Sequence, residues 1–421
     1  MIPIVAIAVL SLLATQCVGQ PTPPSTLYAP YSMSIGAGSP TKGPLVLMQS
    51  PSTLWVLELD LDALGRCAIT VRRLYNNPIP RNVWTANYFS KTPSGSTKCT
   101  LKFTKEGDLE LYTLYKQKSL LTWTSGTANK GVTKMTITNN GDFQLLTAAS
   151  KAVFTSFEWK EFAIVETQKL RLWESLKSPD AVQDIVDNDT IPVLLNKGEF
   201  VLAFDQSRDL VLRTTDAKPL VYWSLKRTLF KGGDLSQVAY AAVNPNNQGG
   251  IGLFTYGGKL VWNSTLPLQG YFGDAYFGID KFGNLKDYYM YKGVGWFTQF
   301  QAIANDCDLP SFCGSSTLCS NSICSCPPKF VKTAGGCKHS SSVNNCKWKN
   351  FEELRGYDTV FDLYATPLKV SLASCKASCV TSCKCAGFSY NAKTGSCYQY
   401  DAFKTIRHVN DNNKSVYVKV T

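Results

Sequence analysis

Gly107-Asp108-Leu109 is the first of four copies of one short pattern, in which Gly or Arg is followed by Asp or Asn and then by an alternating apolar run. The other copies are Gly141-Asp142-Phe143, Arg208-Asp209-Leu210 and Gly283-Asn284-Leu285. Glycine, asparagine and aspartate tolerate positive φ, so each copy predicts a tight hairpin turn leading into an outgoing strand. The irregular spacing of the copies favours strands repeated within two related domains over a solenoid.

The sequence around these copies is typical of β structure. Between residues 27 and 300, short alternating runs such as Leu109-Glu-Leu-Tyr112 and Leu210-Val-Leu-Arg213 are broken by Gly, Asn and Asp. Thr, Val, Tyr, Phe and Trp are frequent, and no long 3.6-residue pattern is present. This predicts an all-β sandwich, barrel or prism. We place the divide between the two domains near residue 160.

The first residues predict export. Met1 to Ala14 form an apolar run that is too short to span a bilayer, and the small residues Val18 and Gly19 follow it. This pattern is typical of a signal peptide, residues 1–19, although a buried N-terminal strand is an alternative reading. No later stretch approaches about 18 uninterrupted apolar residues, so we expect no transmembrane segment. The expected location is extracellular, in the apoplast or bound to the cell wall.

The cysteines divide the chain into a large body with few cysteines and a cysteine-rich tail. Of the 15 cysteines, Cys17 would leave with the signal peptide, and the even number that remains predicts disulfides. Cys67 and Cys99 are the only two in the body, so we expect them to pair. The others lie between Cys307 and Cys397, six on each side of the polar stretch 339–343. Two separately closed modules are therefore expected.

Charge and sequons add two further expectations. A net charge of +12 favours acidic partners such as pectin, although a basic surface can also serve solubility alone. Three sequons, at Asn188, Asn263 and Asn413, become glycosylation sites once export is granted. We expect cell-wall glycans or glycoproteins as partners and no nucleic acid, whereas the oligomeric state stays open.

Catalytic and metal motifs are weak. The two histidines, His339 and His408, lie in no metal-spaced motif, and no Gly-x-Ser-x-Gly elbow occurs. The close cysteines Cys379, Cys383 and Cys385 are better explained by disulfides than by zinc in an oxidising compartment. A carboxylate pair for glycoside hydrolysis stays open, because its members need not be adjacent in sequence. We therefore predict no enzyme, no cofactor and no metal site, with a hydrolase as the least favoured hypothesis.

The repeat resembles the bulb-type, or monocot mannose-binding, lectin strand, whose motif is Gln-x-Asp-x-Asn-x-Val-x-Tyr. Trp84-Thr-Ala-Asn87, the run 123–132, Asn140-Gly141-Asp142 and Phe154-Thr-Ser-Phe157 are similar to the same family. The resemblance implies that three polar side chains bind the hydroxyls of one mannose, that Val packs on the sugar and that Tyr donates a further bond. Alternate residues of a strand point to one side, which explains the spacing.

The tail resembles two further modules. Asp306-Cys-Asp-Leu-Pro-Ser-Phe-Cys-Gly314 with Cys324-Ser-Cys-Pro327 is similar to the EGF-like knot of S-locus glycoproteins, and the cysteines from Cys375 to Cys397 are similar to a PAN/apple module. Nearly all of the chain after residue 60 resembles the epidermis-specific secreted glycoproteins of plants, which lack a kinase. The resemblance implies two tandem β-prism domains, 27–160 and 161–302, then an EGF-like knot, 303–338, and a small α+β PAN module, 346–421. One short helix is expected around Ser371–Val380.

The resemblance also implies most of the disulfides. In the knot, the implied pairs are Cys307–Cys319, Cys313–Cys324 and Cys326–Cys337. In the PAN module they are Cys375–Cys397 and Cys379–Cys385, and the four-residue step from Cys375 to Cys379 places both on one helix face. Cys346–Cys383 is left by elimination.

The sugar motif is incomplete in every copy. The first copy reads Thr104, Glu106, Asp108, Glu110, Tyr112; the second Thr138, Asn140, Asp142, Gln144, Leu146; the third Asp205, Ser207, Asp209, Val211, Arg213; the fourth Asp280, Phe282, Asn284, Lys286, Tyr288. An Asp in place of Asn can only accept hydrogen bonds, and Glu, Gln or Lys in place of Val removes the apolar platform. The first and fourth copies keep the Tyr, so the candidate sugar-binding residues are Glu106, Asp108, Tyr112, Asp280, Asn284 and Tyr288.

These observations predict a secreted, non-catalytic, lectin-like glycoprotein that binds mannose-type or wall polysaccharide through degenerate motifs. The alternative is a structural or protein–protein interaction glycoprotein of the wall, with the PAN module as the contact. In that alternative, the motif strands are kept for folding and bind no sugar.

Overall fold

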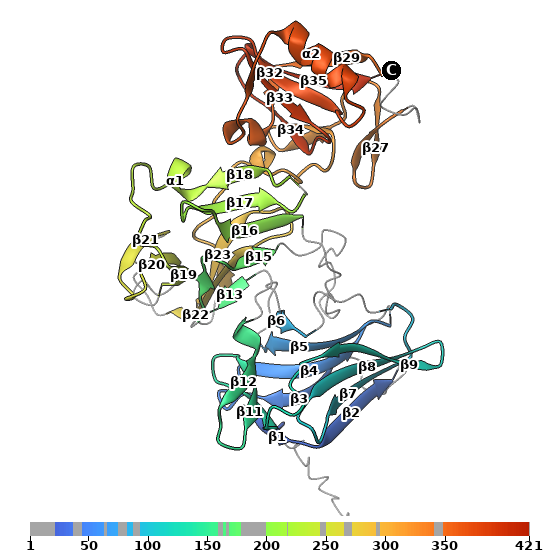
Figure 1. The fold of residues 1–421 in the computed structure, drawn as a ribbon, viewed down its shortest axis with the longest axis vertical. Helices are drawn as coiled ribbons and strands as arrows, with labels where there is room; N and C mark the ends of the chain where they lie inside the picture. The colour runs from blue at the N-terminus through green and yellow to red at the C-terminus, as the bar shows by residue number, and fades with distance from the viewer. Residues whose placement is uncertain are drawn as a thin grey trace, which may run out of the picture.

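The computed structural model describes residues 22–36, 44–62, 65–74, 82–86, 93–158, 163–165, 168–177, 199–216, 218–244, 250–264, 272–291, 295–340 and 348–420. The predicted signal peptide, Asn188 and Cys346 lie outside these ranges. The described parts form three bodies stacked along the long axis of the molecule, with the first lectin-like domain at one end and the Cys-rich tail at the other (Figure 1).

The first domain consists of three four-stranded antiparallel sheets. The first sheet has the order β3 (Leu45–Gln49), β4 (Trp55–Leu61), β5 (Cys67–Arg73), β6 (Asn82–Thr85). The second has the order β2 (Tyr31–Gly36), β7 (Lys98–Phe103), β8 (Leu109–Tyr115), β9 (Lys118–Thr124). The third has the order β1 (Thr26–Tyr28), β10 (Val132–Ile137), β11 (Phe143–Thr147), β12 (Ala152–Thr155), and η1 (Ser156–Glu158) follows it. Three sheets around one core make a β-prism.

The core of this prism follows from the alternation read in the sequence. In β8, Leu109 and Leu111 are fully buried, whereas Glu110 between them is half-buried on the outer face. Trp84 lies at the centre, with its ring centroid 5.7 Å from Phe143 and 5.8 Å from Phe154. Period-2 burial of this kind is what a sheet with one buried face requires.

The second domain repeats the three-sheet plan. One sheet has the order β13 (Ala163–Val165), β22 (Phe272–Ile279), β23 (Leu285–Tyr291), β24 (Gly295–Phe297). Another has the order β14 (Leu170–Arg171), β19 (Tyr240–Val243), β20 (Ile251–Phe254), β21 (Leu260–Asn263). The third has the order β15 (Ser175–Lys177), β16 (Phe200–Phe204), β17 (Leu210–Thr214), β18 (Val221–Ser224), and the short helix α1 (Leu225–Thr228) follows it. The expectation of two tandem prisms is confirmed.

The tail contains a small knot and an α+β module. The knot comprises η3 (Asp306–Asp308), β25 (Thr317–Ser320), β26 (Ile323–Ser325), β27 (Phe330–Thr333) and β28 (Gly336–His339). In the last module, a five-stranded sheet has the order β29 (Asn350–Arg355), β35 (Lys414–Val420), β32 (Gly387–Asn391), β33 (Ser396–Tyr400), β31 (Leu368–Lys369). The same module adds β30 (Tyr357–Asp358), η5 (Val360–Leu363), α2 (Leu372–Thr381) and β34 (Thr405–His408).

Six disulfides lie within the described residues. They are Cys67–Cys99, Cys307–Cys319, Cys313–Cys324, Cys326–Cys337, Cys375–Cys397 and Cys379–Cys385. Each of these coincides with an expected pair, and none of the six joins the knot to the PAN module. The remaining expected pair, Cys346–Cys383, falls partly outside the described residues, so it stays a prediction.

The helix α2 is fixed at both ends. Ser371 caps its N-terminus by accepting the N–H of Ser374 at 3.2 Å, as a serine N-cap does. Cys375 and Cys379 are buried on one helical face and tie the helix to β33 and to Cys385. At the C-terminal end, the buried Lys419 ammonium donates to the carbonyls of Cys379 and Ser382 at 3.1 and 3.2 Å. The predicted helix is confirmed.

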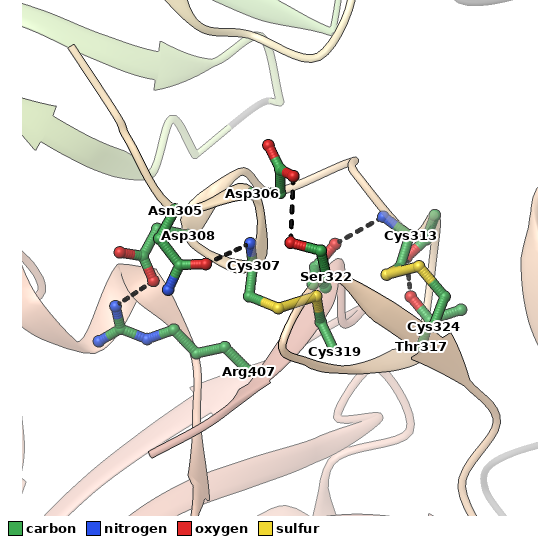
Figure 2. Close-up of a disulfide and its surroundings, with 12 residues drawn as sticks. Asn305, Asp306, Cys307, Asp308, Cys313, Thr317, Cys319, Ser322, Cys324 and Arg407 are labelled. Atoms are coloured by element: carbon green, nitrogen blue, oxygen red, sulfur yellow. Dashed lines mark hydrogen bonds and ion pairs between the residues drawn. A yellow bond between two sulfur atoms is a disulfide. The ribbon is translucent and has the colours of Figure 1, made fainter. Parts of the chain in front are cut away.

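The knot and the PAN module share a sheet, which no sequence pattern indicated. Strand β25 of the knot pairs in parallel with β34 of the PAN module, and the four-stranded order is β26-β25-β34-β30. Arg407 of β34 binds Asp308 of the knot at 2.7 Å and Asp358 of β30 at 2.6 Å. Figure 2 shows the Arg407–Asp308 pair beside the Cys307–Cys319 and Cys313–Cys324 disulfides. The two modules are therefore separate in their described disulfides but continuous in their hydrogen bonds.

The second prism also contacts the PAN module. Arg227 of α1 donates to the carbonyl of Leu363 at 2.7 Å, and the rings of Tyr222 and Phe361 meet edge to face at 6.3 Å. An ion pair of 2.8 Å joins Lys404 to Glu199 at the surface. These contacts dock the tail on the second prism, as the stacking in Figure 1 shows.

Candidate carbohydrate-binding site

All four pattern copies form the predicted hairpin turn. In the first, the N–H of Thr104 donates to the carbonyl of Asp108 at 2.8 Å, and that of Gly107 donates to the carbonyl of Thr104 at 3.0 Å. The corresponding bonds at the other three copies are 2.9–3.1 Å long. The turns therefore connect β7 to β8, β10 to β11, β16 to β17 and β22 to β23.

The positive φ of each turn falls on the residue before the Asp or Asn. It is +85° at Gly107, +85° at Gly141, +63° at Arg208 and +86° at Gly283. A Cβ at Gly107 would lie 2.4 Å from the carbonyl oxygen of Val132, so space as well as φ requires glycine there. Arg208 tolerates the left-handed region without that crowding, and its guanidinium donates to the carbonyl of Val238 at 2.8 Å.

The Asp or Asn of each copy binds backbone or hydroxyl groups at or after the end of the last strand of its own sheet. The Asp108 carboxylate accepts the hydroxyls of Thr124 and Ser125 at 2.6 and 2.7 Å and the N–H of Thr127 at 2.9 Å. The other copies repeat this arrangement: Asp142 accepts from Thr155, Ser156 and Phe157, Asp209 accepts from Ser224 and Lys226, and Asn284 exchanges two bonds with the backbone of Ile303. These four side chains are buried and close the sheet.

The same network sets the charge state of Asp108. Burial raises the pKa of its carboxyl, but the hydrogen bonds from Thr124, Ser125 and Thr127 outweigh burial and hold that pKa below its usual value. The carboxylate is therefore ionised and its acceptor sites are used by the protein. This is a structural role for the position that takes the motif Asn of the lectin family.

In the fourth copy, the candidate sugar-binding side chains already interact with other residues of the domain. The Asp280 carboxylate accepts the N–H groups of Phe282 and Asn284 at 2.9 Å and forms an ion pair of 2.8 Å with Lys286, which occupies the motif Val position. Tyr288 stacks on Tyr276, with centroids 4.6 Å apart and planes 12° apart. Burial, then Asp280 and Asp287, raise the pKa of Tyr288 well above its usual value. The Tyr288 ring and the Asp280 carboxylate therefore make contacts within the second prism.

The first copy differs because its Tyr lies on an open sheet face. Glu110 and Tyr112 point outward from β8, and the Tyr112 hydroxyl donates to Glu110 at 2.9 Å. Lys102 of β7, opposite Glu110 in register, places its ammonium 4.6 Å from the centre of the Tyr112 ring. Thr100, opposite Tyr112, shares a hydrogen bond of 2.9 Å with Ser34 of β2. Glu106, the remaining candidate of this copy, is exposed in the turn.

Three further turns with the same pair of bonds escaped the sequence pattern. Asp62, Gly65 and Arg66 between β4 and β5 repeat the bonds of Thr104, Gly107 and Asp108, with Gly65 at φ +69°. Thr147–Lys151 between β11 and β12, and Thr255–Lys259 between β20 and β21, repeat them as well. A corner serine after an aromatic residue, as in Trp123-Thr-Ser125 and Trp262-Asn-Ser264, was the signal that could have revealed the threefold repeat.

The outer face of the sheet β3-β4-β5-β6 is shielded from solvent at its central strands. Glu58 and Asp60 of β4, and Thr70 of β5, face outward and are at most 5% exposed. Arg72 forms an ion pair with Glu58 at 2.5 Å. Burial, followed by the charges of Asp62 and Glu58, raises the pKa of Asp60 to about 7.

Asp60 gives the first prism a measurable pH dependence. In the folded state the Asp60 carboxyl keeps its proton up to about pH 7, whereas in the unfolded chain it releases that proton near pH 3.8. The contribution of Asp60 to the free energy of unfolding is therefore complete below pH 3.8 and is lost as the pH rises towards about 7. Between pH 3.8 and about 7, the free energy of unfolding should fall less in the Asp60→Asn variant than in the wild type. Chemical denaturation across that range measures it. Identical pH profiles for the two proteins would contradict the raised pKa.

The asparagines of two sequons are among the described residues, and both lie next to or at the end of a strand. Asn413 is exposed before β35, where its side-chain amide donates to Asp411 at 3.0 Å. Asn263 is half-buried at the end of β21. Both stay predicted glycosylation sites, as does Asn188, which lies outside the described residues.

The described ranges contain neither a metal-binding cluster nor a membrane-spanning helix. No group of three or more His, Cys, Asp or Glu side chains there is arranged to hold a metal ion. Within the same ranges, no helix has the length and apolar character needed to cross a membrane.

Comparison with known proteins finds similarity to several plant proteins. No family model matches it. A PAN domain-containing protein of Arabidopsis thaliana is 27% identical over 318 residues, which is 72% of this chain and 60% of that protein. EP1-like glycoprotein 3 of the same plant is 23% identical over 367 residues, which is 80% of this chain and 78% of that protein. The chain is similar to the EP1-like glycoproteins over most of its length. The resemblance stated from the motifs is thereby confirmed.

Two other kinds of protein share part of this similarity. A G-type lectin S-receptor-like serine/threonine-protein kinase of Arabidopsis thaliana is 25% identical over 66% of this chain, but the match spans only 33% of the kinase. Among solved structures, the two-domain, fetuin-binding Scilla campanulata agglutinin is 16% identical, with 66% of this chain and 99% of the agglutinin covered and a TM-score of 0.23. A monomeric mannose-binding lectin of Gastrodia elata is 18% identical over 31% of this chain, with 96% of that lectin covered and a TM-score of 0.22. The prism assignment rests on the sheet topology and not on these scores.

Proposed function

We propose that this protein is an extracellular, non-catalytic, lectin-like glycoprotein that binds carbohydrate on the outer face of the sheet β2-β7-β8-β9. The observation that carries the proposal is the open position of Tyr112, with Glu110 and Lys102 beside it. An aromatic ring with charged and hydroxyl groups at its edge suits a sugar, whose ring has an apolar face and polar hydroxyls.

The other copies supply the contrast. In the fourth copy, Tyr288 stacks on Tyr276 and Asp280 is paired with Lys286. The second and third copies have Leu146 and Arg213 where the motif has Tyr. Of the residues predicted for sugar binding, we therefore retain Tyr112 as a contact and Glu106 as a neighbour, and we give Asp108 and Asn284 a structural role.

Export and wall binding are supported by several features. The disulfides of the tail suit an oxidising compartment, and the EP1-like relatives are glycoproteins by name. The net charge of +12 suits acidic wall glycans such as pectin. A non-catalytic role is supported by the two histidines, because His408 packs against Tyr357 at 5.2 Å and His339 against Trp348 at 4.4 Å.

Tyr112→Ala should weaken glycan binding about tenfold, which corresponds to roughly 1.4 kcal/mol, because the stacking surface and the bond to Glu110 are both lost. A glycan array on the secreted protein identifies ligands, and titration of the best ligand measures the loss. Tyr256→Ala is the control, since Tyr256 is 75% exposed on the second prism and should leave binding unchanged. Equal affinity of wild type and Tyr112→Ala would place the site elsewhere. No binding to any glycan would favour the structural or protein–protein interaction alternative.

A further inference from the structure

The face around Tyr112 has one end of mixed charge and one basic end. Its outward-facing residues form three cross-strand rows: Ser32–Lys102–Glu110–Thr124, Ser34–Thr100–Tyr112–Leu121 and Gly36–Lys98–Leu114–Ser119. Glu110 is the single carboxylate in these rows, all of which lie in the described part of the chain. Beyond the first row lies the turn with Lys105 and Glu106, and beyond the third lies the turn with Lys116 and Lys118.

The lysines are spaced along a path and not gathered at one point. Lys98 and Lys102 lie on the same side of β7, four residues apart, which is about 14 Å at the usual rise of a strand. Lys118 is opposite Tyr115 in register, and the Lys116 ammonium lies 5.2 Å from the centre of the Tyr115 ring. Lys98, Lys102, Lys116 and Lys118 are all exposed. The path runs from Lys102 past Tyr112 to the β8–β9 turn.

From this arrangement we infer that the face binds a linear polyuronate, a polysaccharide with a carboxylate on each sugar. The inference rests on the proposed function, to which it adds the acidic class of ligand and the direction of the chain. One sugar ring packs on Tyr112, with its carboxylate at Lys102. The following sugars extend over Leu114 and Leu121, where a later carboxylate meets Lys98. The chain then reaches Lys116 and Lys118 around the tip of the β8–β9 hairpin, because the Tyr115–Lys118 pair alternates with the outer row Leu114–Ser119.

The charges decide between a polyuronate and a second copy of this chain. Strand β9 is the edge of its sheet, and Leu121 on it is 51% exposed, so edge-to-edge pairing with another copy has to be considered. Strand β9, Lys118–Thr124, carries no carboxylate that could pair with Lys118 of a second copy. A polyanion meets the same lysines with opposite charge, and the hydroxyls of Ser34 and Thr100 suit sugar hydroxyls.

The strength of the interaction follows from its exposure to water. Each lysine–carboxylate contact at an exposed position contributes at most about 1 kcal/mol and is screened by salt. Affinity must therefore come from several contacts along one chain, and it should increase with the length of the oligosaccharide and decrease with salt.

The test uses the full-length secreted protein and two probes, de-esterified oligogalacturonate and its methyl-esterified form. The variant Lys98→Gln/Lys116→Gln/Lys118→Gln removes the basic end. The control variant Lys130→Gln/Lys151→Gln/Lys218→Gln removes the same net charge from exposed lysines elsewhere on the prisms. We expect at least tenfold weaker binding of de-esterified oligogalacturonate to the first variant, and wild-type binding by the control variant.

Several results would overturn the inference. Equal weakening in both variants would mean that binding depends on net charge alone. Equal affinity for the methyl-esterified probe would mean that carboxylates are not recognised. Tighter binding to vesicles containing phosphatidylserine than to oligogalacturonate would assign the basic end to a membrane surface. If neutral glycans bind through Tyr112 while oligogalacturonate does not, the inference fails and the proposed function stands. If no glycan binds, both fail.

Discussion

Arg407→Met should lower the free energy of unfolding of the knot and the PAN module by about 2–3 kcal/mol, because Asp358 loses one of its two ionic partners and Asp308 loses its ion pair. The Asp358 side chain is fully buried, and Arg407 binds it at 2.6 Å while also reaching Asp308 of the knot at 2.7 Å. Lys414 then remains the other ionic partner of Asp358, at 2.7 Å. Because Arg407 lies on β34, its loss also loosens the pairing of β34 with β25.

Hydrogen exchange measures this effect locally, since amide protons of β25 and β34 should exchange much faster in the variant. Lys404→Met is the matched control. It removes a 2.8 Å ion pair with Glu199, whose side chain is 52% exposed, so it should cost no more than about 1 kcal/mol. Unchanged exchange in β25 of the Arg407→Met variant would mean that the knot is held by its disulfides alone.

Asp108→Ala should destabilise the first prism by about 3 kcal/mol. Three donors, the hydroxyls of Thr124 and Ser125 and the N–H of Thr127, lose an ionised acceptor, and bonds to charged groups are the stronger class. If Asp108 were kept for sugar binding, its removal would reduce affinity and leave stability unchanged. Denaturant unfolding of the wild type and the variant separates these two roles.

Glu106→Ala provides the control for Asp108→Ala. Glu106 is exposed in the same turn, so its replacement should change stability by less than about 0.5 kcal/mol. The lowered pKa of Asp108 adds a pH signature: its stabilisation is present above the unfolded pKa and is lost as pH falls through the lower, folded pKa. Equal stability of the Asp108→Ala and wild-type proteins would contradict the structural role.

The sequence was sufficient for those features that depend on local chemistry. Turns could be predicted at Gly107, Gly141 and Gly283, because the residue before the Asp or Asn adopts positive φ. Alternation in runs such as Leu109-Glu-Leu-Tyr112 predicts strands with one buried face. The step from Cys375 to Cys379 placed two sulfurs on one face of a helix, and α2 has them there. Turn, strand and helix periodicities are set by a few neighbouring residues, so a pattern search finds them.

What each polar side chain does was decided by tertiary structure. Asp108 and Asn284 match the sugar motif in sequence, but the corners at Thr124–Thr127 and Ile303 lie 16–19 residues later and reach them only when the sheet closes. Tyr112 and Tyr288 occupy the same motif position, yet one lies on an open face and the other stacks on Tyr276. The parallel pairing of β25 with β34 joins residues almost ninety positions apart. A hydrogen bond or a stacked ring depends on which segments meet in space, and spacing along the chain does not contain that information.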